Sequence, residues 1–406
     1  MLFVLGVVLF ALGIAVSIAL HEAGHMWTAQ KLGMKVRRYY IGFGPKVFAF
    51  RRGETEYGLK AIPAGGFCDI AGMTALDELA PDEVDRAMYK QKTWKRLVVM
   101  SGGIAMNFVL GIVLIFGLAV TSGLPNTDDR AVIGSLDCAA PTQAGEEGGY
   151  APSECQGTGP AQDAGLQVGD VVVAVGGTPV DTFEDLVRST RALTGPADFT
   201  VERGDETLTV PVAVQQVQRW VYESDAADAE PVSRTVGAIG VGAEPPVLEY
   251  GPLEAVPATF GFTGYLAART AEALVSLPGK VSDLWTAVTG GERSIDTPVS
   301  VVGASVIGGQ FAERGIWQSF VLLLAQLNFF LGAFNLVPLL PLDGGHMAVA
   351  IYERIRNWFR NLRGKPVGAP VDYMKLLPLT YVAVVIGGAF MVLTLTADIV
   401  NPIKLF

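Results

Sequence analysis

The sequence predicts a polytopic α-helical membrane protein, with about four transmembrane helices and one α/β domain outside the membrane. Half of its 406 residues are hydrophobic and only 17% are charged, against about 25% in typical soluble domains. Four stretches are long and apolar enough to span a bilayer: residues 2–27, 97–120, 317–340 and 376–397. A long acidic segment separates the second stretch from the third.

The first stretch has an alternative interpretation as a cleaved signal peptide. It lacks a basic segment before the apolar run and a clear small-residue cleavage site, and polar residues follow it directly. These features are not typical of a signal peptide. We therefore expect residues 2–27 to remain in the protein as a membrane span.

Charge is distributed unevenly between the segments that join these stretches. Residues 31–96 carry 13 Lys and Arg against 8 acidic residues, and residues 351–375 are also basic. Residues 124–250 contain 21 acidic residues, 6 Arg and no Lys, a net charge of −15. Short basic loops tend to stay in the cytoplasm. The sequence therefore predicts that both basic loops are cytoplasmic, and that the acidic segment and both termini lie outside.

Two segments carry β-strand patterns. Residues 36–75 alternate partly between apolar and polar side chains around a Gly53-Glu54 turn, which predicts a β-hairpin. Its strand edge could pair with an extended peptide. In the acidic segment, the runs VVVAV, DFTVER and TLTVPVAV bracket an amphipathic helix at residues 182–193. This order predicts a small α/β domain.

The three cysteines divide between the two sides of the membrane. Cys138 and Cys155 lie in the outer segment, 17 residues apart, where an oxidising environment permits a disulfide. A pair of free thiols is the alternative. Cys68 lies on the cytoplasmic side, and we expect it to be a free, structural thiol.

The motif HEAGH lies at the end of the first apolar stretch. Residues four apart on a helix share one face, so His21 and His25 can ligate one metal while Glu22 takes a proton from a nearby water. The alternative is two buried, hydrogen-bonded histidines beside a glutamate that reaches for the membrane surface. Ionisable groups at mid-span cost about 2.5–3.5 kcal/mol, and a bound metal offsets that cost. We therefore favour a metal site.

A zinc site needs a third protein ligand and an open position. The third apolar stretch ends in NLVPLLPLDGGHMAVA, residues 335–350, where two prolines prevent a regular helix. Asp343 and His346 are both candidates. Asp343 could instead cap a helix, and His346 could face a lipid headgroup. The spacing alone does not choose between them.

HEAGH together with NLVPLLPLDGG resembles the site-2 protease family of intramembrane zinc metalloproteases, peptidase family M50, and most of all its single-PDZ actinobacterial members. The resemblance extends over nearly the whole chain, including IGFGP and TEYGLKAIPAGGFCDIAGM, where it implies a membrane-associated β-hairpin. It implies one Zn²⁺ held by His21, His25 and Asp343, with Glu22 as the catalytic base. It leaves His346 as a neighbour of the ligands or of the substrate.

Two asparagines also match the family pattern. Asn107 ends GIAMN, where the family has Gly-Pro-x-x-Asn, although Ile104 replaces the proline. Asn328, in AQLNFF, matches an asparagine that the family places close to the substrate. The resemblance implies a substrate-binding role for both. The alternative for each is a hydrogen bond between helices.

Residues 161–177, AQDAGLQVGDVVVAVGG, resemble a PDZ domain, a fold that binds extended peptides at a sheet edge. The predicted organisation is a first transmembrane helix (1–35), a β-hairpin (36–75), a linker and second transmembrane helix (76–123), an extracytoplasmic PDZ-like domain (124–215), an extracytoplasmic linker with amphipathic helices (216–316), a third transmembrane helix with the LDG motif (317–350), a basic loop (351–375), and a fourth transmembrane helix with the C-terminus (376–406).

The resemblance implies a cell-membrane metalloendopeptidase that cleaves transmembrane segments of single-span proteins, such as anti-sigma factors already cut by a site-1 protease. It implies the lipid bilayer and these proteins as partners, with no nucleic acid. The competing interpretation is an inactive membrane scaffold or a metal transporter with a PDZ module. A transporter needs ionisable residues along several spans, whereas here they cluster at one depth.

Overall fold

A computed structural model describes residues 1–146, 149–152, 155, 157–221, 232–243, 247–291, 293–294, 297–403 and 405. The chain divides into two compact units. One combines Met1–Gly123 with Glu249–Phe406, and the other is Leu124–Leu248. The acidic segment is therefore an insertion between two halves of a helical unit.

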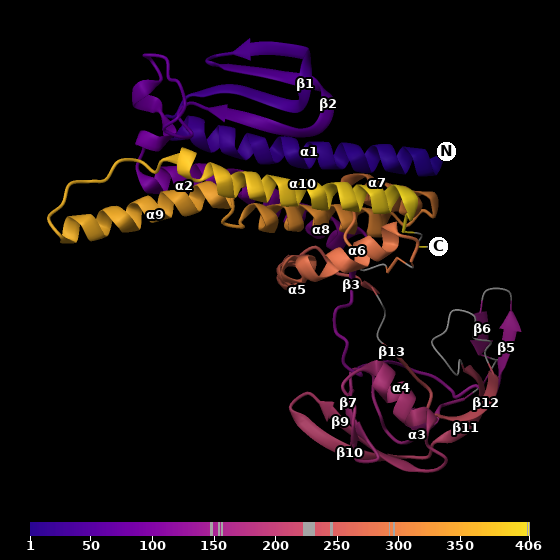
Figure 1. Ribbon diagram of the computed structural model, residues 1–406. Helices are drawn as coiled ribbons and strands as arrows, with labels where there is room; N and C mark the ends of the chain where they lie inside the picture. The colour runs from indigo at the N-terminus through magenta and orange to yellow at the C-terminus, as the bar shows by residue number, and fades with distance from the viewer. Residues whose placement is uncertain are drawn as a thin grey trace. The chain divides into compact units, whose positions relative to one another are not determined.

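The helical unit is built on long apolar helices. Four described helices are long and apolar enough to cross a membrane, which confirms the multi-pass prediction: α1 (Leu2–Lys31), α2 (Thr93–Thr121), α8 (Trp317–Asn335) and α10 (Leu377–Val400). They run side by side in Figure 1. The remaining described helices of this unit are α5 (Ala255–Ser276), α6 (Val281–Val288), α7 (Val301–Glu313) and α9 (Asp343–Leu362), with 3-10 turns at Val84–Arg86, Met88–Lys90, Leu277–Lys280 and Tyr373–Lys375.

Small residues let α1 approach its neighbours closely. A Cβ on Gly24 would lie 2.2 Å from the carbonyl oxygen of Gly102 on α2, and a Cβ on Gly6 would lie 2.4 Å from the Cβ of Ala312 on α7. Such contacts are typical of helix packing in membranes, where dispersion rather than the hydrophobic effect holds helices together. They fix α1, which carries the HEAGH motif, against α2 and α7.

The predicted hairpin is a more complex sheet. β1 (Val36–Arg52) and β2 (Thr55–Ile70) each fold back on themselves, so that residues 36–41 lie between 56–59 and 66–70, while residues 46–52 pair with 55–60. Gly42 and Gly44, with φ of 87° and 83°, lie where β1 turns, a conformation that suits glycine. The simple hairpin prediction was therefore incomplete, and the outer strands of the described sheet are residues 46–52 and 66–70.

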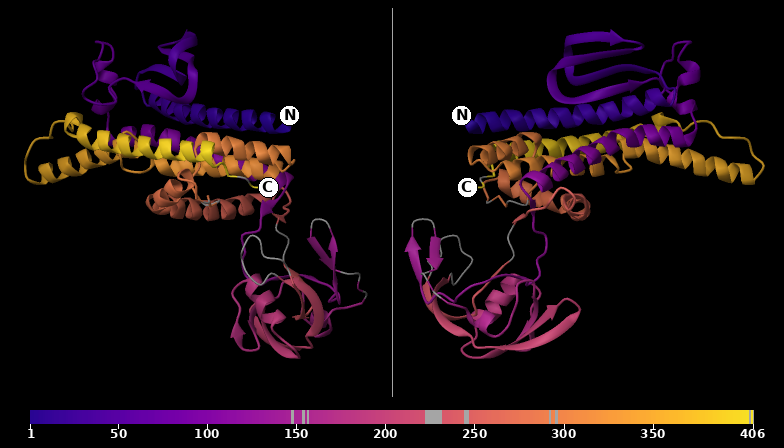
Figure 2. Two further views of the ribbon diagram at one scale, coloured as in Figure 1. Left: turned by 45° about the vertical axis from the view of Figure 1, so that its right-hand side comes forward. Right: turned by 180° about the vertical axis from the view of Figure 1, so that it is seen from behind.

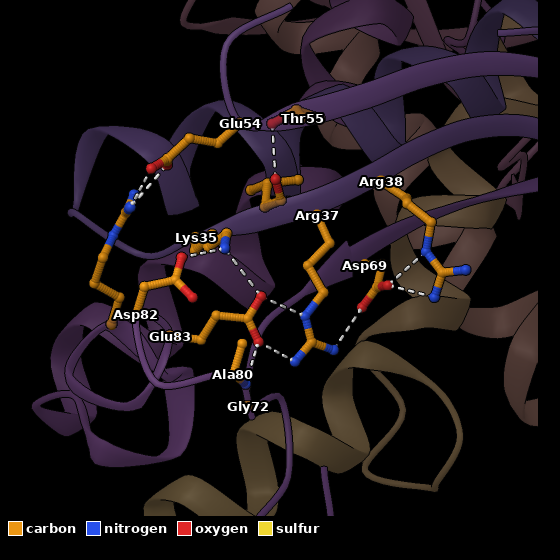
Figure 3. A network of polar contacts seen from close by, with 12 residues as sticks. Lys35, Arg37, Arg38, Glu54, Thr55, Asp69, Gly72, Ala80, Asp82 and Glu83 are labelled. Atoms are coloured by element: carbon orange, nitrogen blue, oxygen red, sulfur yellow. Dashed lines mark hydrogen bonds and ion pairs between the residues drawn. The ribbon is translucent and has the colours of Figure 1, made fainter. Parts of the chain in front are cut away.

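A network of ion pairs joins the base of this sheet to the loop that leads into α2 (Figure 3). Arg37 donates to both carboxylate oxygens of Glu83, at 3.0 and 2.6 Å, and Lys35 bridges Glu83 and Asp82. The hydrogen bonds from Arg37 lower the pKa of the Glu83 carboxyl to about 2. This network fixes where α2 begins relative to the sheet.

A buried ion pair closes the C-terminal end of α10. The predicted fourth span ended at residue 397 and contained no charge, but α10 continues to Val400 and includes Asp398. Asp398 accepts a hydrogen bond from Arg293 at 2.6 Å, and both side chains are buried. Asp398 also accepts the backbone N–H of Ser300, just before α7. The charge is tolerated because it is fully paired.

The inserted unit is a small α/β structure. Its described elements are β3 (Leu124–Pro125), β4 (Ile133–Leu136), β5 (Gln143–Glu146), β6 (Gly149–Pro152), α3 (Pro160–Asp163), β7 (Val171–Val175), β8 (Thr178–Pro179), α4 (Phe183–Arg191), β9 (Ala197–Arg203), β10 (Glu206–Val212), β11 (Gln215–Val221), β12 (Val232–Ala238), β13 (Val241–Ala243) and β14 (Val247–Leu248). The main sheet has the order β10-β9-β7-β8. The core strands and the helix that were predicted from VVVAV, DFTVER and TLTVPVAV are present. Figure 2 shows this unit from two further sides.

The end of the inserted unit differs from the prediction. The boundary expected at residue 215 falls short, because the described strands β11–β14 belong to the same unit, which ends at Leu248. The predicted linker at 216–251 also includes residues 222–231 and 244–246, which lie outside the described residues. The disulfide between Cys138 and Cys155 is confirmed, and Cys68 is free.

Candidate metal centre and active site

The HEAGH motif places two imidazoles together on α1. His21 and His25 are one turn apart, both are buried, and their Nε2 atoms are 3.2 Å from each other. Because the helix sets the spacing, both rings point at the same place without any help from the loops. This is the arrangement expected of two ligands to one ion.

Asp343 completes a three-membered cluster. Its Oδ2 atom is 3.2 Å from the Nε2 atoms of both His21 and His25. Asp343 is the first residue of α9, after a break in the helical path at residues 336–342. Gly344 and Gly345 lie against the backbone of this break, where a Cβ on either would meet main-chain atoms at 2.4–2.5 Å. The glycines therefore let the segment fold tightly enough to bring Asp343 to α1.

The three donor atoms fit a zinc ion. They form a triangle with sides of 3.2 Å, and a tetrahedral site with bonds of about 2.0–2.1 Å has edges of about 3.3 Å. Asp343 Oδ2 is also a buried carboxylate oxygen with no hydrogen-bond partner among the described residues. A buried acceptor of this kind is costly unless a cation satisfies it. Two imidazoles and one carboxylate are a common ligand set of catalytic zinc.

Both histidines are oriented through their other ring nitrogen. His25 Nδ1 lies 2.8 Å from the carbonyl oxygen of Val99 on α2. This carbonyl can only accept, so Nδ1 carries the proton and Nε2 has its lone pair free for a metal. His21 Nδ1 lies 3.2 Å from the side-chain amide of Asn107, also on α2.

Asn107 is suited to hold His21 as a ligand. Its Nδ2 faces His21 Nδ1, and its Oδ1 is buried with no hydrogen-bond partner among the described residues. Turning the amide by 180° gives Oδ1 to the protonated Nδ1 of a His21 that ligates through Nε2. The same turn satisfies the buried oxygen. Asn107 therefore contacts a predicted ligand directly, and its predicted contact with substrate stays a prediction.

Gly103 leaves room for the donor atoms. A Cβ at this position would lie 2.3 Å from His25 Nε2 and 2.8 Å from His21 Nε2. Gly103 lies on α2, one turn before Asn107 and one turn after Val99. One face of α2 thus supplies two hydrogen-bond partners for the histidines and the space between them.

Glu22 lies beside the cluster and faces the sheet. Its electrostatic neighbours include His21, His25, Asp343 and the backbone of Cys68. Gly66, in the outer strand at residues 66–70, approaches so closely that a Cβ there would lie 3.2 Å from the Glu22 Cγ. Burial raises the pKa of the Cys68 thiol, so this free cysteine is a poor nucleophile and fits its predicted structural role.

An ion pair at the N-terminal end of α2 holds α9 in place. Arg96 donates to Glu353 at 2.5 Å, and both side chains are about nine-tenths buried. Glu353 is ten residues beyond Asp343 on the same helix and also accepts the backbone N–H of Val371 at 2.7 Å. The pair therefore ties the helix that begins with Asp343 to the helix that supports His21 and His25.

The other predicted residues lie around the cluster. His346 is not in the donor triangle, and its Nδ1 is 3.3 Å from the hydroxyl of Tyr373. Asn328 is fully buried and donates to the carbonyl oxygen of Leu324 in its own helix. Sequence reasoning did not identify the Arg96–Glu353 pair. The sequence offered only one hint of this pair: Arg96 directly precedes the second apolar stretch, and Glu353 follows the third.

Known proteins resemble this chain over its full length. The sequence model of peptidase family M50 matches residues 9–379. The zinc metalloprotease Rip1 of Mycobacterium tuberculosis is 53% identical over 410 residues, covering 100% of both chains. The zinc metalloprotease Rip1 of Mycolicibacterium smegmatis is 52% identical over 414 residues, again with 100% coverage of both.

These relatives carry the metal in their names, and a donor set that fits zinc is present in this chain. Its four membrane-spanning candidates agree with a multi-pass membrane enzyme. The chain belongs to peptidase family M50 and is a zinc-dependent metalloendopeptidase.

Proposed function

We propose that this enzyme cleaves transmembrane segments of single-span membrane proteins, inside the bilayer and close to its cytoplasmic face. The observation that carries the proposal is the meeting of His21 and His25, on an apolar helix that can span the membrane, with Asp343. A soluble protease has no need to build its metal centre on such a helix. The basic residues 31–96 favour a cytoplasmic location for the adjoining end of α1.

The residues of the cluster divide the chemistry among them. His21, His25 and Asp343 would hold the zinc, which acts as a Lewis acid and lowers the pKa of water to about 7. Glu22, beside them, would accept a proton from the attacking water and return it to the leaving nitrogen. Val99 and Asn107 would keep the imidazoles oriented throughout.

The substrate must present an extended backbone. A transmembrane helix hides its carbonyls in internal hydrogen bonds, so the cleaved segment has to unwind. The sequence suggested that a strand edge of the hairpin within residues 36–75 holds it. The outer strand at residues 66–70 is a better candidate, because Gly66 in it lies next to Glu22. Strand addition there would lay the scissile bond beside the base.

The inserted unit would lie outside the cell, as its acidic composition suggests. We propose that it is PDZ-like and acts on the substrate before cleavage. It would either bind the new C-terminus left by a site-1 protease or exclude proteins with bulky outer domains. Anti-sigma factors are the substrate class that this organisation fits best.

Replacement of Glu22 by alanine tests the activity. The purified Glu22→Ala variant, in lipid vesicles, should keep one zinc per chain and lose cleavage of a single-span test substrate. The matched control is Glu78→Ala, which removes an exposed carboxylate from the segment that follows α1. Undiminished cleavage by Glu22→Ala would rule Glu22 out as the base. Zinc without cleavage in the wild type would favour a scaffold, and zinc movement across the vesicle would favour a transporter.

A further inference from the structure

The second half of α9 exposes a continuous apolar stripe. Its members recur at helical positions i, i+1, i+4, i+7, i+8 and i+11, so they cover an arc of about 120° on one face. Four of the six are aromatic or isoleucine side chains at least half exposed. The stripe consists of Ile351, Tyr352, Ile355, Trp358, Phe359 and Leu362, which are 43, 57, 50, 55, 50 and 66% exposed.

Cations border this stripe on both sides. Arg354 lies next to the Trp358 edge, and Arg363 lies next to the Tyr352 edge, with Lys365 just beyond the end of the helix. All three are exposed, and none forms an ion pair or hydrogen bond through its side chain with another described residue. The single acidic residue in this half of the helix, Glu353, is turned away onto Arg96. The exposed face is therefore apolar in the middle and positive at its borders.

The face of α9 beyond the Tyr352 edge is already occupied. Arg356 donates to the carbonyl oxygen of Ala369, and Arg360 donates to that of Pro366. The returning chain therefore runs along α9 back to Tyr373, which contacts His346 in its first turn. Both ends of the segment from Asp343 to Tyr373 therefore lie close to the metal centre. In Figures 1 and 2, α9 continues past the beginning of α10, so the stripe lies where the spanning helices end.

We propose that the exposed face of α9 binds anionic phospholipids of the cytoplasmic leaflet, with the stripe among the acyl chains and Arg354, Arg363 and Lys365 on the headgroups. This proposal rests on the cytoplasmic orientation given under the proposed function. Aromatic side chains with flanking cations are typical of helices at the membrane interface. Charge complementarity favours anionic lipid over a neutral surface, and each cation near such a surface raises association about fivefold.

The position of α9 gives this contact a consequence for the enzyme. The same helix begins with Asp343, and the Arg96–Glu353 pair holds its middle against α2. Lipid bound at the far end would therefore restrict the movement of the helix that supplies Asp343, one of the three donor residues. Leaflet composition would act on the metal centre through a continuous element.

Quenching of Trp358 by brominated lipids tests the contact without using activity. The chain has six tryptophans, so the Trp358 contribution is taken as the difference between the wild type and Trp358→Phe. Brominated phosphatidylglycerol should quench this contribution more strongly than brominated phosphatidylcholine at equal mole fraction. The preference should fall at least tenfold in the triple variant Arg354→Gln, Arg363→Gln, Lys365→Gln, and also at about 1 M salt, where the Debye length is about 3 Å.

A charge-matched variant and a competitor complete the experiment. Arg52→Gln, Lys90→Gln, Lys92→Gln removes three exposed cations from the other basic segment and should leave the preference unchanged. Equal quenching by the two lipids would overturn the anionic-lipid assignment. No quenching by either would show that the stripe does not contact lipid and would overturn the proposal. Loss of preference in inorganic phosphate, at constant ionic strength, would show a free-phosphate site instead. Because the readout needs no zinc or cleavage, an inactive enzyme that keeps the preference would refute only the proposed function.

Discussion

Replacing Gly103 by alanine should destroy the metal centre while leaving the fold intact. The new Cβ would lie 2.3 Å from His25 Nε2 and 2.8 Å from His21 Nε2. These are the atoms that we assign to zinc. Alanine favours the helical state over glycine by about 1 kcal/mol, so α2 itself should not be weakened.

The size of the effect follows from the space required. His25 Nε2 must move about 1 Å to reach an ordinary contact distance, whereas metal–ligand bonds tolerate only about ±0.2 Å. One histidine therefore leaves the coordination sphere, or α2 moves away from α1. The second route also costs the close packing at Gly24 and Gly102, where a Cβ on either glycine would lie 2.2–2.5 Å from the carbonyl oxygen of the other. We expect zinc affinity to fall by at least about 100-fold, beyond the 10- to 100-fold typical of residues that only support a ligand.

Competition with a chelator, together with thermal unfolding in detergent, measures both parts of this prediction. Gly117→Ala is the matched control, because it makes the same change on the same helix at a site with nothing within 4 Å. It should bind zinc and cleave substrate as the wild type does. If Gly103→Ala binds zinc with unchanged affinity, the donor atoms do not lie where we place them and the reasoning is wrong.

Three further predictions concern residues outside the donor triangle. Asn107→Ala should weaken zinc binding by about 10- to 100-fold in the same competition assay, whereas Asn328→Ala should leave the affinity unchanged. A loss of affinity in Asn328→Ala and none in Asn107→Ala would show that Asn328, not Asn107, supports the ligands. Glu353→Gln leaves Arg96 buried without its charge partner, so thermal unfolding should show that the free energy of unfolding falls by about 3–5 kcal/mol. The double variant with Arg96→Met should lose less. Equal losses in the two variants would show that the two side chains do not form a pair. Glu83 has a pKa lowered from 4.5 to about 2, so its ion pairs stabilise the loop fully above about pH 4.5, and this stability, about 1 kcal/mol after solvent screening, is lost as the pH falls towards 2. Amide exchange of the loop should show this loss in the wild type and not in Glu83→Gln.

The sequence was sufficient for features that depend on local spacing. His21 and His25 share a helix face by their separation alone, and α1, α2, α8 and α10 follow from apolar length. The break before Asp343 follows from two prolines, and the strand at Val171–Val175 follows from its composition. In each case one short stretch contains all of the information.

Features that depend on contacts between distant segments could not be predicted from a short stretch of sequence. Gly103 looks like any small residue in a spanning helix until α1 lies against it. The prediction of a simple hairpin was incomplete, because Gly42 and Gly44 allow β1 to turn back, so that residues 36–41 pair on both sides. Arg96 pairs with Glu353 across 257 positions. Whether a charge at the end of an apolar stretch is paired or solvated depends on such a partner, and no local pattern reveals it.

X-ray absorption at the zinc edge tests the ligand assignment most directly. The wild-type enzyme loaded with one zinc should show two imidazole nitrogens and oxygen neighbours, and His346→Ala should give the same spectrum. Asp343→Ala should lose zinc or show a changed first shell, with both imidazoles retained where metal remains. If Asp343→Ala leaves the spectrum unchanged while His346→Ala removes an imidazole, the metal centre is not the one formed by His21, His25 and Asp343.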